Sequence, residues 1–195
     1  MYLRIICMLL FFAVSLSGFT WTGEMYFDCN IVYAENAETY FNRGMSYFKL
    51  GDYDKAISEF IEAIKINPRY IEAYYNRGEA WLKKRDYSRA IVDFNRVIEV
   101  EPRNKMAYYN RGRAWNNSAD AWYKEENYDK SIDGCNNALI DFTKALEIEP
   151  NPSLDVQLQK LQVLMKNKIE ATNGVKKADQ ILKKAEEMER ERRRR

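Results

Sequence analysis

The side chains that most often do chemistry in proteins are scarce in this chain of 195 residues. It contains no histidine, which is the commonest general base and the commonest metal ligand. Its three cysteines, Cys7, Cys29 and Cys135, form no C-x-x-C pair, so neither a zinc site nor a dithiol redox motif is indicated. The sequence also lacks a phosphate loop, a glycine-rich dinucleotide turn and a nucleophile elbow. We therefore expect a protein that is not an enzyme and that uses no cofactor or metal.

Charged side chains are numerous but balanced, with 31 lysines and arginines against 29 aspartates and glutamates. The net charge of +2 gives no bulk electrostatic argument for anionic lipid, and a nucleic-acid partner is not expected. Acidic residues fall at helical positions that we expect to be exposed, so a solvated surface explains them better than a catalytic carboxylate pair. With only 4 prolines and 8 glycines but 14 tyrosines, the composition favours a helical array with aromatic packing. No small-molecule substrate is indicated.

Residues 1–34 have the pattern of a secretory signal. Arg4 is followed by an uncharged stretch from Ile5 to Gly23, and the first part of this stretch is continuously apolar. The segment 32–34 (VYA) presents small or tolerated residues at the positions that a signal peptidase reads, so cleavage would leave Glu35 as the first residue. We therefore expect an exported protein, either periplasmic or secreted.

An uncleaved membrane anchor at residues 1–34 is the main alternative, and a cytosolic chain is the third. The uncharged stretch is barely long enough to span a bilayer, and serines, threonines and glycines dilute it. Export and anchoring both place the rest of the chain outside the cytoplasm, because Arg4 precedes the stretch whereas Glu24 and Asp28 follow it. Residues 1–34 would also allow the chain to associate with a membrane.

A repeat with a period of 34 residues dominates the rest of the sequence. The segment YFNRG at 40–44 recurs as YYNRG at 74–78 and at 108–112. Each glycine is followed three positions later by an aromatic residue: Tyr47, Trp81 and Trp115. Three further pairs recur at the same step: Ala56 and Ala90, Phe60 and Phe94, Pro68 and Pro102. This pattern, which extends from Ala37 to about Pro152, resembles the tetratricopeptide repeat (TPR).

The resemblance implies an all-α fold, a right-handed α-solenoid of about three helix pairs with a C-terminal capping helix. The glycines lack side chains where paired helices approach closely, and the prolines end the second helices. The expected segments, after the signal or anchor at 1–34, are repeat 1 at 37–70, repeat 2 at 71–104, repeat 3 at 105–152, a capping helix at 153–174 and a charged helical tail at 175–195. Arg43, Arg77 and Arg111 precede the glycines where the family often has an aliphatic residue, and we expect each arginine stem to pack while its head reaches solvent.

The third repeat is longer than the first two. Twelve residues separate Gly44 from Ala56, whereas twenty-six separate Gly112 from Ala138, an excess of fourteen residues or two heptads. Because seven residues are nearly two helical turns, we expect both helices of this repeat to be extended with one face kept in register. The hairpin tip, near residues 123–130, would then project beyond the solenoid. The alternative is a loop at 116–127.

Beyond the repeats, the sequence predicts two more helices. Ser153 is expected to cap a helix whose apolar residues recur at helical spacing, and Asn173-Gly174 is expected to end it. Residues 175–191 are expected to form a highly charged helix that leads to Arg192–Arg195. This basic end has two interpretations. It could contact anionic lipid or nucleic acid, or it could be a solvated tail. The second is favoured because acidic residues dilute the basic ones.

In TPR proteins the first helix of each pair lines a concave face, and in many members asparagines on that face hydrogen-bond the backbone of an extended peptide. Asn42, Asn76 and Asn110 match that ladder, and an amide suits a peptide backbone because it both donates and accepts. The neighbours expected to give specificity are Phe41, Tyr75 and Tyr109 beside the asparagines, and Met45, Glu79 and Arg113 one helical turn later. The alternative is that the asparagines only stabilise neighbouring repeats.

The TPR subfamily that clamps a chaperone's C-terminal carboxylate is not matched. Phe41 and Met45 replace the lysine and asparagine with which that clamp begins, and Asn110 stands where it needs a cation. We therefore expect an exported adaptor that binds a peptide or partner protein in its concave groove and assists the assembly of an envelope complex. One alternative is a membrane-anchored structural subunit that assembles through the extended third hairpin and the C-terminal helix. Another is an accessory domain for an enzyme acting in trans.

Overall fold

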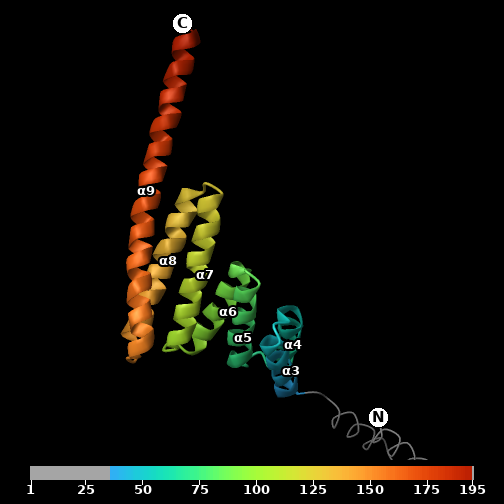
Figure 1. Ribbon diagram of the computed structural model, residues 1–195. Helices are drawn as coiled ribbons and strands as arrows, with labels where there is room; N and C mark the ends of the chain where they lie inside the picture. Colours follow the sequence, from blue (N-terminus) through green and yellow to red (C-terminus); the bar gives the residue numbers. More distant parts are fainter. Residues whose placement is uncertain (1–35, 195) are drawn as a thin grey trace, which may run out of the picture. The chain divides into compact units, whose positions relative to one another are not determined.

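Proline and glycine are scarce enough in this sequence for long helices to form. The computed structural model describes residues 36–194, and in this range the chain forms seven α-helices and no strand (Figure 1). The helices are α3 (Ala37–Lys49), α4 (Tyr53–Ile66), α5 (Ile71–Lys83), α6 (Tyr87–Val100), α7 (Lys105–Lys124), α8 (Tyr128–Glu147) and α9 (Pro152–Arg194). The signal or anchor expected at residues 1–34 lies outside the described residues. None of the described helices is long and apolar enough to cross a membrane.

Consecutive helices pack side by side as the pairs α3–α4, α5–α6 and α7–α8, and α9 packs against α8 (Figure 1). The first helices of successive pairs also touch, since α3 contacts α5, α5 contacts α7, and α7 contacts α9. Within the described range, each pair contacts only its neighbours in the row, as expected for a fold built of stacked repeats. The prediction of an all-α solenoid of helix pairs is confirmed.

The two helices of every pair are joined by the same short turn. Each turn contains one residue with a positive φ. In chain order these residues are Gly51 (78°), Arg85 (63°) and Glu126 (58°). The next residue caps the second helix, because its side chain accepts a hydrogen bond from the backbone N–H three residues on. These caps are Asp52, Asp86 and Asn127, with distances of 3.2, 3.1 and 3.3 Å. Since glycine occupies only the first turn, the packing of the paired helices must hold the other two in this conformation.

Three glycines allow the paired helices to approach closely. A Cβ atom on Gly44, Gly78 or Gly112 would lie 2.7, 3.0 or 2.6 Å from a phenylalanine ring of the second helix. These rings belong to Phe60, Phe94 and Phe142, which are fully buried. Glycine is therefore required at these positions by the packed ring, as the repeat pattern predicts.

The fourteen additional residues of the third repeat lie in helices. α7 and α8 have 20 residues each, whereas the helices of the earlier pairs have 13 or 14. Gly112 meets Phe142 as Gly78 meets Phe94, because seven residues added to each helix return the side chains to the same face. Residues 116–124 belong to α7, so the alternative of a loop at 116–127 is wrong.

Arg77 and Arg111 each make two hydrogen bonds to an aspartate of the second helix. In both pairs Nη2 lies 2.6 Å from Oδ1 and Nε lies 2.9 Å from Oδ2. The carboxylates belong to Asp93 and Asp141, whose side chains are 3% and 2% exposed. The two arginine side chains are 18% and 21% exposed, because each buried carboxylate needs a charged partner and binds the guanidinium, whereas Arg43 is 38% exposed. The expectation of heads that reach solvent therefore fits Arg43 better than Arg77 and Arg111.

α9 is a single helix of 43 residues, so the break expected at Asn173-Gly174 and the separate tail helix are wrong. Contacts to the extended hairpin hold α9 on both sides of this glycine. Lys168 pairs with Asp120 of α7 at 2.7 Å, and Lys176 pairs with Asp129 of α8. A glycine in a helix interior costs roughly 1 kcal/mol, which these contacts and the packing on α8 outweigh. α9 therefore follows the hairpin to its tip.

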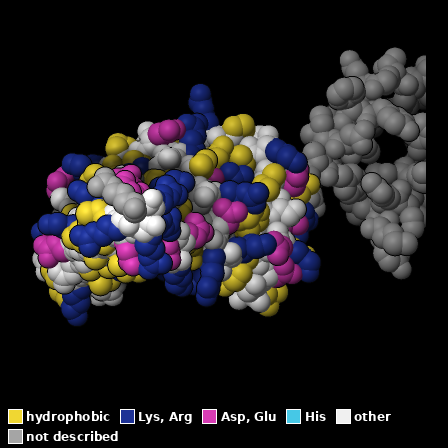
Figure 2. Space-filling view, turned by 90° about the horizontal axis from the view of Figure 1, so that it is seen from above, with side chains coloured by type: hydrophobic (Ala, Val, Ile, Leu, Met, Phe, Trp, Pro, Cys, Tyr) yellow, Lys and Arg dark blue, Asp and Glu magenta, His cyan; other side chains and the backbone are white. Residues whose placement is uncertain are grey.

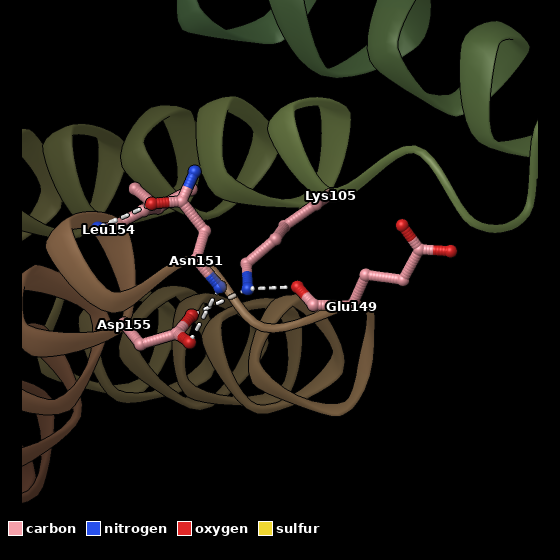
Figure 3. Close-up of polar contacts among 5 residues, drawn as sticks. All are labelled: Lys105, Glu149, Asn151, Leu154 and Asp155. Atoms are coloured by element: carbon pink, nitrogen blue, oxygen red, sulfur yellow. Dashed lines mark hydrogen bonds and ion pairs between the residues drawn. The ribbon is translucent and has the colours of Figure 1, made fainter.

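The start of α9 is capped by Asn151 and not by Ser153 (Figure 3). The Asn151 Oδ1 accepts from the Leu154 N–H at 3.2 Å, and the Asp155 carboxylate accepts from the Asn151 N–H at 2.9 Å. Pro152 takes the first helical position, where its fixed φ fits and no N–H is needed. The cap therefore falls on the residue before the proline, two positions earlier than expected.

Lys105 ties the start of α9 to α7 and is 11% exposed. Its ammonium group donates to the Asp155 carboxylate at 2.5 Å and to the Glu149 carbonyl oxygen at 2.9 Å (Figure 3). The hydrogen bond from Lys105 lowers the pKa of Asp155, so the carboxylate stays charged at neutral pH. The first turn of α9 is thus fixed to the third pair.

Candidate functional site

The nine residues predicted to line a groove lie on the three first helices. α3 carries Phe41, Asn42 and Met45, α5 carries Tyr75, Asn76 and Glu79, and α7 carries Tyr109, Asn110 and Arg113. Because α3 contacts α5 and α5 contacts α7, these three sets follow one another across adjacent helices. The three sets differ in how many of their polar groups already form hydrogen bonds within the protein.

Asn110 is the centre of a hydrogen-bonded cluster between α5 and α7. Its Nδ2 donates to the Tyr75 hydroxyl at 2.9 Å and to the Glu79 carboxylate at 3.3 Å. Its Oδ1 accepts from the Arg113 guanidinium at 3.1 Å. Asn110 is only 1% exposed, so its amide joins two repeats and does not lie on the surface expected to meet a peptide. At this position the alternative that the asparagine stabilises neighbouring repeats describes the structure better.

Burial raises the pKa of both Tyr75 and Glu79 in this cluster. For Tyr75, the Glu79 carboxylate adds to the rise, while the hydrogen bond with Asn110 opposes it. For Glu79, the Asn110 hydrogen bond and the charge of Arg113 oppose the effect of burial. The tyrosine is therefore neutral at physiological pH, and its hydroxyl can accept from the Asn110 amide.

The three aromatic residues among these nine face the core. Phe41, Tyr75 and Tyr109 pack against the buried rings of Phe60, Phe94 and Phe142, with ring centroids 5.8, 5.8 and 6.4 Å apart. All three are half-buried. Their rings help to join the two helices of each pair, so they supply less surface to a partner than the sequence suggests.

Asn42 and Asn76 differ from Asn110 in their surroundings. Asn42 is exposed, and Asn76 is half-buried with its Nδ2 donating to the Glu72 carbonyl of its own helix at 2.7 Å. The residues one repeat before Tyr75 and Glu79 are Phe41 and Met45, which have no polar group to bind the Asn76 amide. These two asparagines are therefore the part of the ladder that remains at the surface.

A hollow of about 420 Å³ lies beside the extended α7, and no motif in the sequence points to it directly. It lies between the α5–α6 turn, where Arg85 and Tyr87 line it, and the added turns of α7, where Ser118 and Trp122 line it. The recognisable signal was the seven-residue extension of α7, which carries that helix past the preceding turn. In the described range, no group of acidic residues and cysteines is arranged to hold a metal ion.

The surface charge is mixed on a local scale. Figure 2 shows basic and acidic side chains interspersed on the face that it draws, with hydrophobic side chains between them. Such a surface has no extended field of one sign, in agreement with the near balance of charges in the sequence. A partner that binds this face must therefore be recognised by local contacts.

Family models match the first two helix pairs. A model described as TPR repeat matches residues 44–84, and one described as tetratricopeptide repeat matches residues 71–104. No curated protein matches the sequence.

Solved structures with similar folds cover about two thirds of the chain. The second TPR domain of human RPAP3, solved with the HSP70 peptide SGPTIEEVD, is 26% identical with a TM-score of 0.53, over 65% of this chain and 94% of that one. The TPR2B domain of yeast Sti1, in its pHsp70 complex, is 25% identical with a TM-score of 0.50, over 67% and 96%. The first TPR domain of human RPAP3, at 21% identity and a TM-score of 0.56 over 71% and 95%, shows the fold alone.

Proposed function

We propose that this chain, as a tetratricopeptide-repeat protein, is a protein-interaction scaffold. It binds an extended segment of a partner protein across α3 and α5. The observation that carries this proposal is that Asn42 and Asn76 lie at equivalent positions of two touching helices and remain at the surface. An amide can donate to one backbone carbonyl and accept from one backbone N–H without reading the side chains of the peptide.

The solved relatives support a peptide ligand. The human RPAP3 domain was solved with an HSP70 peptide and the yeast Sti1 domain as a pHsp70 complex, at 26% and 25% identity to this chain. Recognition of a terminal carboxylate is not part of the proposal, because Phe41 and Met45 offer it no positive charge and Asn110 is buried. We call the surface around Asn42 and Asn76 the α3–α5 strip. Specificity then depends on the side chains that flank this strip, namely Met45, Glu79 and Arg113.

Replacing both surface asparagines with alanine is expected to weaken peptide binding by about 10-fold or more. Each lost hydrogen bond is worth about 1 kcal/mol, and about 1.4 kcal/mol corresponds to a factor of ten in affinity. The probes are peptides selected from a displayed random library on the wild-type chain, with Kd measured by fluorescence anisotropy for wild type and for Asn42→Ala/Asn76→Ala. Each peptide is made with a free and with an amidated C-terminus.

The matched control is Asn136→Ala/Asn167→Ala, which removes two exposed amides from α8 and α9. The proposal requires that this control binds like wild type and that amidation leaves Kd unchanged. Equal affinities for the Asn42→Ala/Asn76→Ala variant and wild type would exclude the strip as the binding surface. Loss of binding on amidation would show a carboxylate site instead.

We also propose that the chain is exported and that the scaffold assists the assembly of an envelope complex, on the strength of residues 1–34 alone. The intact mass of the chain isolated from the soluble and membrane fractions of its host checks the first part. The expected result is a mature chain that begins at Glu35, because cleavage follows Ala34. A full-length mass confined to the membrane fraction would favour the uncleaved anchor.

A membrane-anchored structural subunit is the second candidate function. The observation that favours it is the length of α9, which continues beyond the α7–α8 hairpin (Figure 1). Such a subunit would assemble through the extended hairpin and α9 and would leave the α3–α5 strip empty.

A further inference from the structure

The second half of α9 carries apolar residues that no other described part of the chain covers. Val175, Ile181, Leu182 and Met188 are 37%, 63%, 61% and 53% exposed. A Cβ atom on Gly174 would meet no other atom within 4 Å. Large apolar side chains in a row on a solvated helix are unusual unless another surface covers them.

Ile181 and Met188 lie on the face of α9 that is turned away from the hairpin, whereas Val175 and Leu182 lie at its edge. Thr172 is buried, and Lys168 and Lys176, one turn before and after it, contact α7 and α8. At 100° per residue, Ile181 lies about 180° around the helix from Thr172. The apolar face is therefore accessible even where α9 packs against the hairpin.

The apolar face has the spacing of a coiled-coil seam. Its positions alternate by three and four residues, and we call them the α9 seam: Ala171, Gly174, Ala178, Ile181, Ala185 and Met188. A 3–4 alternation is the heptad pattern by which one helix packs along another. Val175 and Leu182, one heptad apart, lie next to the seam and widen it. Small residues occupy one position of each heptad, and the other position is large in the last two heptads.

We propose that the α9 seam pairs with the α9 seam of a second copy of this chain as an antiparallel coiled coil. In that orientation Ala178 faces the partner's Met188, and Ala185 faces the partner's Ile181. Every such layer then combines one small and one large side chain, which fills space evenly and lets the helices approach closely. A parallel pair would instead stack alanine on alanine and methionine on methionine.

The charges beside the seam agree with this orientation. Lys177 and Glu191 occupy the same heptad position two heptads apart, and the antiparallel register brings each opposite the other in the second copy. Two ion pairs form in this way, whereas Lys184 lies opposite its own equivalent at the centre, where the two like charges oppose the pairing and are outnumbered by the ion pairs. The two repeat arrays lie at opposite ends of the coiled coil, so neither blocks the α3–α5 strip of the other.

The test is the concentration dependence of the mass of the full chain, measured by sedimentation equilibrium. The expected result is a monomer–dimer equilibrium for wild type, and a dimer at least about 100-fold weaker for Ile181→Glu/Met188→Glu, since each charge enters an apolar layer. Val92→Glu/Ile140→Glu is the matched control, because these residues of α6 and α8 are also well exposed, at 65% and 58%. The control is expected to dimerise like wild type.

The orientation is tested by thiol cross-linking with a short bis-maleimide. Copies carrying Ala178→Cys are mixed with copies carrying Met188→Cys, in a background in which Cys7 and Cys29 are serine. Cys135 is buried, at 2% exposure, and burial raises the pKa of its thiol, so it reacts slowly. A cross-link between the two variants is expected.

Three outcomes would overturn the proposal. A chain that stays monomeric at all concentrations would exclude self-pairing, and a cross-link between two Ala178→Cys copies would show a parallel pair. The third is a monomer that binds vesicles of anionic and neutral phospholipid through Ile181 and Met188, which would assign the seam to a membrane surface. None of these outcomes bears on peptide binding at Asn42 and Asn76, so the two proposals fail separately.

Discussion

Replacing Arg111 with methionine is expected to lower the free energy of unfolding by about 3–5 kcal/mol at neutral pH. The substitution keeps much of the stem volume but removes the guanidinium that donates twice to Asp141, at 2.6 and 2.9 Å. The Asp141 side chain is 2% exposed, so its charge would be left in the protein interior without a counter-charge. Urea denaturation followed by circular dichroism measures the loss.

The pH dependence of this loss identifies its cause. Burial raises the pKa of Asp141 even beside Arg111, whose hydrogen bond and charge oppose the rise, so Arg111→Met raises that pKa further. A carboxyl group with a higher pKa in the folded state binds its proton more readily there, and the stability that it contributes is lost as the pH rises through that pKa. The destabilisation should therefore shrink as the pH is lowered from neutrality.

Two control variants separate charge from packing. Arg43→Met removes the equivalent arginine of the first repeat, which is 38% exposed and pairs with the less buried Glu59, so the loss there should be about 1 kcal/mol or less. Arg111→Met/Asp141→Leu removes both charges and should recover most of the stability. A loss in Arg111→Met that is independent of pH and persists in this double variant would contradict the explanation.

Phe142→Ala is expected to destabilise the fold by about 3–5 kcal/mol, because it leaves a cavity in the core of the third pair. Phe142 is fully buried and packs against Tyr109 and the backbone of Gly112. The same ring explains why position 112 must be glycine, since a Cβ there would lie 2.6 Å from the ring. Thermal and urea denaturation measure the effect.

A double-mutant cycle with Gly112→Ala makes this prediction sharper. In the wild-type background Gly112→Ala should cost about 1–3 kcal/mol, because the added methyl group collides with the ring. In the Phe142→Ala background it should instead stabilise by up to about 1 kcal/mol, because the collision is gone and alanine favours the helix. An effect of the same sign in both backgrounds would show that the ring does not set the requirement for glycine.

The sequence predicts those features of the fold that depend on residues close together in the chain. The tip of the third hairpin could be predicted near residues 123–130 because the turn is a local feature, and its cap, Asn127, acts on a backbone N–H only three residues away. The extension of α7 and α8 could be predicted because fourteen residues are two heptads. Seven residues added to each helix are nearly two whole turns, which keeps Gly112 opposite Phe142.

Features that depend on distances between helices could not be predicted in this way. Asn76 and Asn110 look equivalent in the sequence, and only the approach of α5 to α7 shows that the Tyr75 hydroxyl reaches Asn110. Likewise, Gly174 is a plausible helix end by local rules, and the contacts of Lys168 and Lys176 with the hairpin override that preference.

One missed feature was visible in the sequence. An acid follows the arginine by sixteen residues in the first two repeats and by thirty in the third, so the ion pairs of Arg77 and Arg111 share one register. The arginine alone does not reveal this register, which becomes visible only when it is compared with the acidic residue of the second helix.

The constant base of the third hairpin has a consequence for how its length can change. Arg111, Gly112, Asp141 and Phe142 make the same contacts as their counterparts in the second repeat, although α7 and α8 are each longer. Lineages of this protein can therefore lengthen or shorten the hairpin only by a nearly whole number of helical turns, such as seven or eleven residues per helix, added or removed in both helices at once. An indel that leaves a partial turn would rotate the helices beyond it and misplace every contact towards the tip, including those that position α9. The possible lengths of this hairpin therefore form a discrete series, and natural variants should fall into separate size classes.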